Sequence, residues 1–233
     1  MRGQAWSSES AWSFFADDLY HEIEKNRTTE KSSMLDFPAT SKNRDVILKV
    51  LTEVYPPEES LNFLELASGS GQHVAYFAKA CPKWTLQPSD LEVEHLNSIR
   101  EYAEFGKLSN ILLPKQLDTS SAHWDVDASY DGMWAINLIH ISPWEATEGL
   151  FRGAAKHLKP DGKLYLYGAY KKDGEHISAS NVAFDQSLRN RNVKWGVRCL
   201  SDVTKVAEEH GFELDRVVEM PANNLSVLFQ RKK

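Results

Sequence analysis

The chain has 233 residues, of which 42% are hydrophobic and 11% aromatic, and its formal net charge is −6. This composition suffices for a sizeable core and excludes a globally disordered chain. No cluster of Lys and Arg forms a basic stripe, so nucleic acid is not an expected partner. The two cysteines, Cys81 and Cys199, are too few for a disulfide framework or a cysteine-based metal site.

Residues 1–34 are rich in Ser, Glu and Lys and have no sustained periodicity. Within them, one face of a short helix could be lined by Trp12, Phe14, Phe15, Leu19 and Ile23. We expect residues 1–40 to form a loosely held extension, and residues 41–233 to form one domain. The first element of that domain is an amphipathic helix predicted from Asn43 to Val54, which ends before two prolines.

Residues 62–79 predict a strand, a glycine turn and a helix. Phe63, Leu64 and Leu66 form an apolar run of the length of a buried strand. The run breaks at Gly69-Ser70-Gly71, where missing side chains permit a tight turn and close approach of a ligand. Free backbone N–H groups at the start of the following helix can hold a nucleotide-like ligand. An acid inside the strand, Glu65, would oppose a pyrophosphate but suits a cationic ligand.

The remaining elements alternate between strands and helices. Strands are predicted at residues 84–87, 111–117, 130–138, 163–167, 212–220 and 225–230, the run at 130–138 being apolar enough for the centre of a sheet. Helices are predicted from a capping box at Ser89 to Glu92, from an N-cap at Ser142, and over residues 201–210. Residues 119–129 are expected to form a polar loop, and residues 159–162 a turn.

This order predicts an α/β fold. Alternating strands and helices followed by a C-terminal hairpin indicate a doubly wound, Rossmann-like sheet of seven strands with an antiparallel C-terminal pair. In such sheets ligands bind at the carboxyl ends of the strands. The last residues of each strand are therefore candidate site residues.

Two carboxylates follow predicted strands. Asp90 lies 21 residues after Gly69, the spacing at which an acid accepts the ribose hydroxyls of a nucleotide, although Asp90 or Ser89 could instead cap a helix. Asp118 could accept a hydrogen bond from an adenine amino group, or could simply form a turn.

The fourth and fifth strands deliver further polar groups. Asn137 lies at the carboxyl end of the fourth strand, where a ligand would bind, and His140 at the mouth of the same strand is a candidate base. Tyr170 and Lys171 follow the fifth strand. The long polar segment 171–199 is expected to be a functional lid or substrate wall, or else to hold a helix anchored by Phe184, Leu188 and Trp195.

The glycine turn separates two cofactor classes. A dinucleotide fingerprint requires a small third residue, where this chain has Val74. An acid followed by G-x-G instead resembles the first motif of class I S-adenosylmethionine-dependent methyltransferases, whose cofactor carries an ammonium and a sulfonium. The Asn-Pro-Pro-Tyr motif of amino-directed methyltransferases is absent, which argues against a nucleic-acid base as acceptor.

Longer runs carry a more specific resemblance. These are residues 64–73, 87–90, 137–144, 146–150 and 220–225. Together they resemble the methyltransferase-like 26 family and its bacterial relatives of unknown function, over residues 41–233. The resemblance implies a class I methyltransferase fold with S-adenosyl-L-methionine as cofactor. The sequence itself shows no cluster of residues for a metal. The resemblance also leads us to expect Asn181, Trp195, Arg198, Asn223 and Asn224 around a substrate pocket.

The residues expected to line the cofactor site are Glu65, Ala67, Ser68, Gly69, Gly71, His73, Asp90, Leu91, Asp118 and Asn137. The candidate catalytic residues are His140 and Tyr170. The expected reaction is in-line methyl transfer to a small molecule or a protein side chain. A non-catalytic adaptor that keeps the fold is the alternative, and a nicotinamide-dependent reductase is disfavoured by Glu65 and Val74.

Location is inferred from missing signals. No apolar run reaches the length of a membrane span, and Glu9, Asp17 and Asp18 interrupt the apolar residues near the N-terminus. We therefore expect a protein of the cytoplasm or the nucleus, without a membrane partner.

Overall fold

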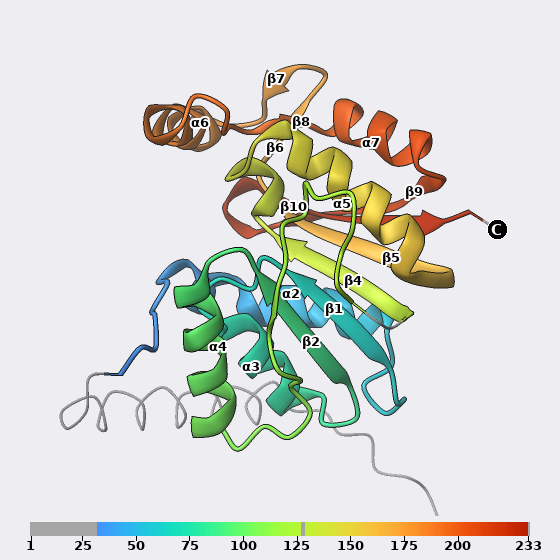
Figure 1. Cartoon of the computed structure of the whole chain (residues 1–233). Coiled ribbons are helices and arrows are strands. Elements are labelled where there is room, and N and C mark those ends of the chain that lie inside the picture. Colours follow the sequence, from blue (N-terminus) through green and yellow to red (C-terminus); the bar gives the residue numbers. More distant parts are fainter. Residues whose placement is uncertain (1–31, 127–128, 233) are drawn as a thin grey trace, which may run out of the picture.

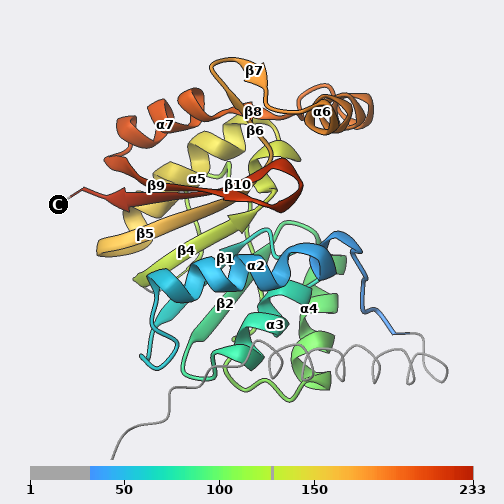
Figure 2. The same cartoon turned by 180° about the vertical axis from the view of Figure 1, so that it is seen from behind.

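The computed structural model describes residues 32–126 and 129–232. A central sheet lies between two layers of helices (Figures 1 and 2). The helix predicted over Trp12 to Ile23 lies outside the described residues. Within the described residues, no helix is both long enough and apolar enough to cross a membrane.

The central sheet has seven strands in the order β3-β2-β1-β4-β5-β10-β9. Their bounds are β1 Asn62–Leu66, β2 Thr85–Asp90, β3 Lys115–Gln116, β4 Tyr130–Ile136, β5 Leu158–Gly168, β9 Phe212–Met220 and β10 Asn224–Arg231. The pairs among β1 to β5 are parallel, whereas β10 is antiparallel to both β5 and β9. The predicted doubly wound sheet with its antiparallel C-terminal pair is confirmed, and β4 lies inside the sheet as expected.

Helices cover both faces of this sheet. One face carries α2 (Ala39–Val54), α3 (Gln72–Ala80) and α4 (Val93–Phe105), and the other carries α5 (Trp144–His157) and α7 (Leu200–Glu209) (Figures 1 and 2). Successive strand residues alternate between the two layers. Phe63 packs in the core under α2, α3 and α4, whereas Leu64 packs in the core under α5 and α7. Because both faces are buried, the carboxyl ends of β1, β2, β4 and β5 are held on a rigid platform.

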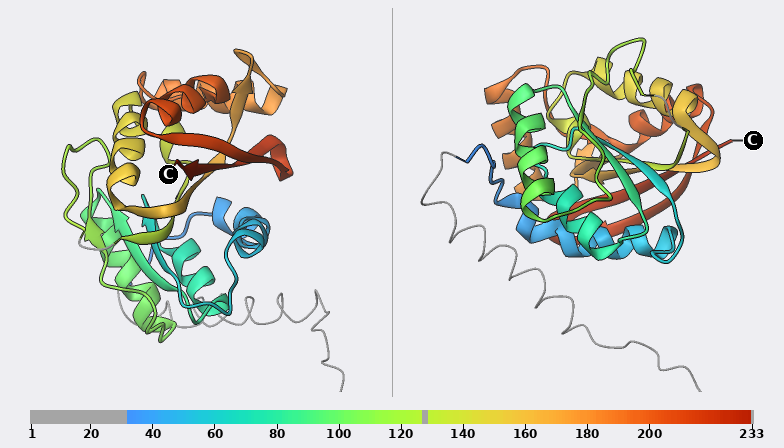
Figure 3. Two further views of the ribbon diagram at one scale, coloured as in Figure 1. Left: turned by 90° about the vertical axis from the view of Figure 1, so that its right-hand side faces the viewer. Right: turned by 60° about the horizontal axis from the view of Figure 1, so that its bottom comes forward.

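The segment after β5 contains regular structure. It forms β6 (Tyr170–Lys172), β7 (Glu175–His176), α6 (Ala179–Arg191) and β8 (Arg198–Cys199), and the three strands pair in the order β7-β6-β8. This small sheet and α6 lie beside the main sheet, next to the end of β5 (Figures 1 and 3). Leu188 of α6 is fully buried, which agrees with the expectation of an anchored helix. The role of this segment as a lid stays a prediction.

Two predicted helix starts are wrong. α4 begins at Val93, because β2 continues through Ser89, whose hydroxyl donates to a carbonyl of β1 (2.7 Å). α5 begins at Trp144, because the Ser142 hydroxyl donates to the carbonyl of Leu138 (2.7 Å) and not to the helix. In both cases a carbonyl outside the helix accepts the hydroxyl that the sequence pattern assigns to a cap.

Two strand boundaries also differ from the sequence expectation. Only Lys115–Gln116 forms β3, and Ile111 contributes a single bridge to Leu86. Residues 159–162 are a bulge inside β5 rather than a turn before it, with Asp161 in the left-handed region (φ 65°). A bulge keeps the strand direction while accommodating extra residues, so turn composition alone does not distinguish it from a loop.

The amino-terminal end of the described chain is part of the packed structure. α2 begins at Ala39, ahead of the predicted start at Asn43, and residues 32–38 lie against α3 and α4. The domain boundary at residue 40 stays a prediction.

Candidate functional site

A loop of left-handed residues connects β1 to α3. Ala67 (φ 53°), Gly69 (φ 58°) and Gly71 (φ 89°) all have positive φ. A Cβ at Gly71 would lie 2.8 Å from the Cα of Ile99 in α4, so only glycine permits this packing. The N–H of Ser68 donates to the carbonyl of Ser89 (2.9 Å), which ties the loop to β2. The glycine turn is therefore held on both sides, by a strand and by a helix.

Asp90 ends β2 and organises the same loop. Its Oδ2 accepts the N–H of Gly69 (2.8 Å), and its Oδ1 accepts the N–H of Glu92 (3.0 Å). Nδ1 of His95 lies 2.9 Å from Oδ1. The carboxylate is thus at the predicted strand end and in direct contact with the glycine turn. Its bond to Glu92 also serves the start of α4, so the binding and helix-start roles are compatible.

Glu65 is a buried acid directly behind this loop. It is only 2% exposed, and its Oε1 accepts the indole N–H of Trp134 in β4 (2.9 Å). Its Oε2 is buried and has no hydrogen-bond partner among the described residues. Burial raises the pKa of Glu65 to about 7, while the Ser68 hydroxyl and the Trp134 indole act in the opposite direction. A buried carboxylate oxygen without a partner is the group that a bound cation would satisfy.

The predicted adenine-side residues lie at the carboxyl ends of β2 and β3. Leu91 follows Asp90 and is 51% exposed, so it offers an apolar surface next to the acid. Asp118 is exposed, and its Oδ1 accepts the N–H and the hydroxyl of Ser120 (2.8 and 2.7 Å). Asp118 therefore forms a turn, which was the alternative to an adenine contact. Its expected contact with a ligand stays a prediction.

His73 lies on the side of α3 that faces α2. Its Nε2 is 2.9 Å from Oδ1 of Asn43 in α2. Burial, together with the nearby charge of Arg44, lowers the pKa of His73 to about 3, so its ring is neutral at physiological pH. The structure thus gives His73 a contact that joins two helices, and its cofactor contact stays a prediction.

Asn137 ends β4 in the left-handed region (φ 60°). Its N–H donates to the carbonyl of Tyr167 in β5 (2.8 Å), and its carbonyl accepts the N–H of His140 (3.1 Å). A Cβ at Gly168 would lie 3.1 Å from Oδ1 of Asn137 and 2.4 Å from Nε2 of His140. Glycine at the end of β5 therefore lets these two side chains converge on one point.

The candidate catalytic residues are completely buried. His140 and Tyr170 are both 0% exposed, and their rings meet edge to face with centroids 5.0 Å apart. Nδ1 of His140 accepts the backbone N–H of Arg198 (3.4 Å), which assigns the ring proton to Nε2. Burial lowers the pKa of His140 to about 3 and raises that of Tyr170 above its usual range. Here Nε2 of His140 is a neutral donor, and its role as a base stays a prediction.

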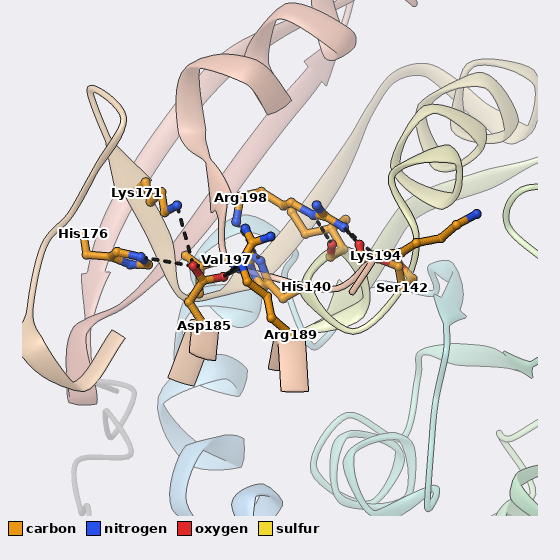
Figure 4. Close-up of polar contacts among 10 residues, drawn as sticks. His140, Ser142, Lys171, His176, Asp185, Arg189, Lys194, Val197 and Arg198 are labelled. Carbon is orange, nitrogen blue, oxygen red and sulfur yellow. Dashed lines mark hydrogen bonds and ion pairs between the residues drawn. The ribbon is translucent and has the colours of Figure 1, made fainter. Parts of the chain in front are cut away.

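β8 covers this pair with an arginine that faces inward. Arg198 donates through Nε to the carbonyl of Ile139 (2.9 Å) and through Nη2 to the carbonyls of Ser142 and Lys194 (both 2.8 Å) (Figure 4). Arg198 was expected around a substrate pocket, and the structure shows it bracing the chain around η1 (Leu138–His140) and the segment before β8.

Asp185 of α6 gathers charged side chains from three elements. We call Lys171, His176, Asp185 and Arg189 the Asp185 cluster. The carboxylate of Asp185 lies 3.7 Å from Nζ of Lys171, 3.3 Å from Nε2 of His176 and 3.2 Å from Nε of Arg189, and it accepts the N–H of Val197 (2.7 Å) (Figure 4). Burial of Asp185 raises its pKa, but these contacts, of which the Val197 N–H has the largest effect, outweigh burial. The pKa of Asp185 therefore lies below its usual range.

Two of the three asparagines expected near a substrate pocket contact each other. Nδ2 of Asn181 in α6 donates to the carbonyl of Asn223 (3.0 Å), and Nδ2 of Asn223 donates to the hydroxyl of Ser180 (3.2 Å). Nδ2 of Asn224 donates to the carbonyl of Pro221 (3.1 Å). Trp195 instead lies under the guanidinium of Arg191, 5.0 Å from the ring centroid. The structure therefore brings Asn181 and Asn223 together and leaves Trp195 apart from them.

A hollow lies away from the glycine turn. It has a volume of about 660 Å³ and is bounded by α5, α7 and the small sheet, with Trp144, Lys171, Cys199 and Lys205 in its wall. None of the residues expected to bind the cofactor lines it. It is therefore separate from the site at the ends of β1 and β2.

Two contributors to the site were not found from the sequence. Trp134 becomes the partner of Glu65 because β1 and β4 pair in a register that places these two residues side by side. Gln72 binds the residues before α2 through its side chain. The residue types give no signal for either contact, since both depend on how distant segments pack.

Residues 34–231 match the family described as "Protein of unknown function (DUF938)". The chain belongs to this family. The match covers every strand of the main sheet and begins within the segment that precedes α2. The finer resemblance to the methyltransferase-like 26 family stays a prediction.

Solved structures share the fold at low sequence identity. An O-methyltransferase family protein from Burkholderia thailandensis superposes with a TM-score of 0.70 at 16% identity, over 96% of this chain and 71% of the other. The mitomycin 7-O-methyltransferase MmcR superposes with a TM-score of 0.66 at 17% identity, over 94% of this chain and 68% of the other. An O-methyltransferase family 2 protein from Planctomyces limnophilus, in complex with apigenin, superposes with a TM-score of 0.69 at 15% identity, over 83% of this chain and 60% of the other. These matches establish the Rossmann-like class I methyltransferase fold.

Proposed function

We propose that this protein is an S-adenosylmethionine-dependent methyltransferase that acts on a small molecule or a protein side chain. The observation that carries the proposal is the Oε2 of Glu65, a buried acid directly behind the glycine turn, which has no hydrogen-bond partner in the described part of the chain. A carboxylate there repels phosphate and favours a cation. It therefore supports a cofactor with an ammonium group over a dinucleotide.

The other residues of the site fit the same cofactor. The carboxylate of Asp90 would accept the ribose hydroxyls, and the exposed side chain of Leu91 would pack against the adenine ring. Glu65 would pair with the ammonium of the methionine part, beside Asn137 at the end of β4. When bound, the cofactor supplies a methyl group on a positively charged sulfur.

The chain's own contribution would be mainly to hold two reactants in line. Positioning of this kind can supply ~7–11 kcal/mol of a reaction barrier, whereas a general base contributes roughly 10²–10⁴-fold. His140 would serve as a neutral donor through Nε2 rather than as a base, because Nδ1 already accepts the N–H of Arg198. The buried Tyr170 hydroxyl, which has no partner among the described residues, would be the second donor next to it.

The nicotinamide alternative fits less well. The third position of the dinucleotide fingerprint is Val74, which is fully buried in α3, and Glu65 lies where a pyrophosphate would be repelled. The net charge of −6 supports a small or protein acceptor over nucleic acid.

The first experiment measures binding of S-adenosylhomocysteine by calorimetry to wild type, to Asp90→Ala and to Asp125→Ala. Asp125 has an exposed side chain and is the matched control. We expect micromolar binding to wild type and to the control, and a Kd at least tenfold higher for Asp90→Ala. The expected loss is ~1.5–3 kcal/mol, the value of a hydrogen bond to a charged group.

The possible results separate the functions considered. Binding that depends on Asp90 supports the site, and a screen of acceptors with methyl-labelled cofactor then looks for turnover. Binding without turnover on any acceptor would favour the adaptor. A wild-type protein that binds a nicotinamide dinucleotide but not S-adenosylhomocysteine would contradict the proposal.

A further inference from the structure

Residues 32–38, which we call the strap, run along α4 to the start of α3. The N–H of Ser33 donates to the carboxylate of Glu101 (3.1 Å), and the N–H of Leu35 donates to the hydroxyl of Ser98 (2.8 Å). The Tyr102 hydroxyl donates to the carbonyl of Leu35 (3.0 Å). The strap is thus fixed at several points along α4 before α2 begins.

The strap ends directly over the glycine turn. The side chain of Gln72, the first residue of α3, accepts the N–H of Phe37 through Oε1 (2.8 Å) and donates through Nε2 to Asp36 (2.9 Å). These two bonds hold the backbone N–H of Phe37 and the carboxylate of the residue before it. A Cβ at Gly69 would lie 3.1 Å from Cε2 of Phe37, so the ring lies against the turn.

The ring of Phe37 is also next to the acid that ends β2. Its other neighbour is His95, with ring centroids 5.7 Å apart at 81°. Gly69 and His95 both contact the carboxylate of Asp90. Phe37 therefore touches two of the groups that surround Asp90.

Packing does not explain this aromatic side chain. Phe37 is 40% exposed and belongs to neither hydrophobic core. It precedes the N-cap Pro38 of α2, where an apolar residue usually packs on the fourth helical position, but that position is the polar Lys42. An ordered, half-exposed ring beside a ligand-binding loop is typical of a residue whose partner is the ligand.

We propose that Phe37 forms a wall of the cofactor site and packs against the ribose and thioether part of the S-adenosyl group held by Asp90. This inference rests on the proposed function and assigns to the strap a binding role that the glycine turn alone does not supply. Contact with the ligand would bury the exposed part of the ring, and the apolar area removed from water would favour binding.

The test is calorimetric titration of the full chain with S-adenosylhomocysteine. The variants are Phe37→Ala, Phe37→Leu and the control Leu214→Ala, a side chain of similar exposure (38%) on the edge strand β9. We expect the Kd to rise about tenfold for Phe37→Ala, equivalent to ~1.4 kcal/mol. Phe37→Leu should give an intermediate value, and Leu214→Ala should bind as wild type does.

A direct contact is checked by nuclear magnetic resonance on protein labelled at its phenylalanine rings. We expect nuclear Overhauser effects between the Phe37 ring and the ribose or thioether protons, which disappear in Phe37→Leu. Wild-type binding with an unchanged or lower Kd for Phe37→Ala, and no such effects, would overturn this inference alone. Absence of wild-type binding would overturn the proposed function and this inference together.

Discussion

At the scale of single residues, Glu65 is the feature that separates this site from a phosphate-binding one. Its carboxylate is buried, one oxygen is bonded to Trp134, and the other has no partner among the described residues. Burial is the main cause that raises its pKa to about 7. In the ligand-free protein, Glu65 therefore contributes stability that is fully present below pH 4.5 and is lost as the pH rises through about 7.

The same shift predicts a pH dependence of binding. A neutral Glu65 cannot pair with an ammonium group, so binding requires loss of the proton that the free protein holds. Raising the pH from 6 to 8 should tighten binding of S-adenosylhomocysteine about tenfold, since at most one proton is released. Calorimetry from pH 6 to 8 measures how the Kd changes with pH. The Kd of Glu65→Gln should not change over this range. The same change with pH in Glu65→Gln would assign the proton to another group.

For His140 the sequence predicts the position in the fold correctly but does not predict the burial of its ring. The sequence places it at the end of β4, and the structure agrees. Sequence position did not reveal that β8 would cover the ring and that Arg198 would donate to its Nδ1. The pKa of His140 falls to about 3 because the ring is buried, which removes it from the physiological range.

At the scale of elements, the small sheet and α6 form a unit beside the main sheet, next to the end of β5. Asp185 is its centre, since one carboxylate faces Lys171, His176 and Arg189 and accepts the N–H of Val197 (Figure 4). This N–H lies just before β8, which carries the arginine that covers His140. The Asp185 cluster therefore ties β6, β7 and α6 to the backbone just before β8.

Asp185→Ala should loosen this unit without unfolding the main sheet. Removing the carboxylate leaves the Val197 N–H without its acceptor and three basic groups without their anion, a loss of ~1–3 kcal/mol. Limited proteolysis should cut faster between β6 and α7, and the Tm should fall. Glu175→Ala, an exposed acid in β7, is the control and should behave as wild type does. Equal cleavage rates in both variants would show that the cluster does not hold the segment.

At the scale of the whole molecule, the strap joins the amino-terminal side of the domain to the site. Its bonds reach Gln72 in α3 and Ser98, Glu101 and Tyr102 in α4. The strap directly precedes α2, the amphipathic helix that was predicted as the first element of the domain. The proposed binding role of Phe37 would therefore couple stability to binding, through residues that sequence composition assigns to an extension.

Two shortened chains test this coupling. A chain that begins at residue 39 lacks the strap, whereas one that begins at residue 32 keeps it. The loss of several hydrogen bonds should cost about 2 kcal/mol or more, which lowers the Tm of the shorter chain by roughly 4–8 °C relative to the longer one. Calorimetric unfolding measures the difference. Equal Tm values would show that the strap contributes nothing to the stability of the domain.

The sequence by itself determined the fold class, the order of the strands of the main sheet and the two strands that carry Asp90 and Glu65. These features depend on periodicity, on glycines with positive φ and on short spacings, all of which are local. The incorrect helix start at Ser89 arose because its hydroxyl donates to the carbonyl of Glu65 in another strand, which local spacing cannot reveal. The Ser142 hydroxyl instead donates to the carbonyl four residues before it.

Only the tertiary structure decided which side chains meet across these elements. The parallel register of β1 and β4 sets Trp134 beside Glu65, the packing of α3 and α4 brings Phe37 over Gly69, and β8 covers His140. Each contact joins segments that lie far apart in the sequence. The burial and the protonation state of these groups follow from that packing, because desolvation depends on every neighbour in space.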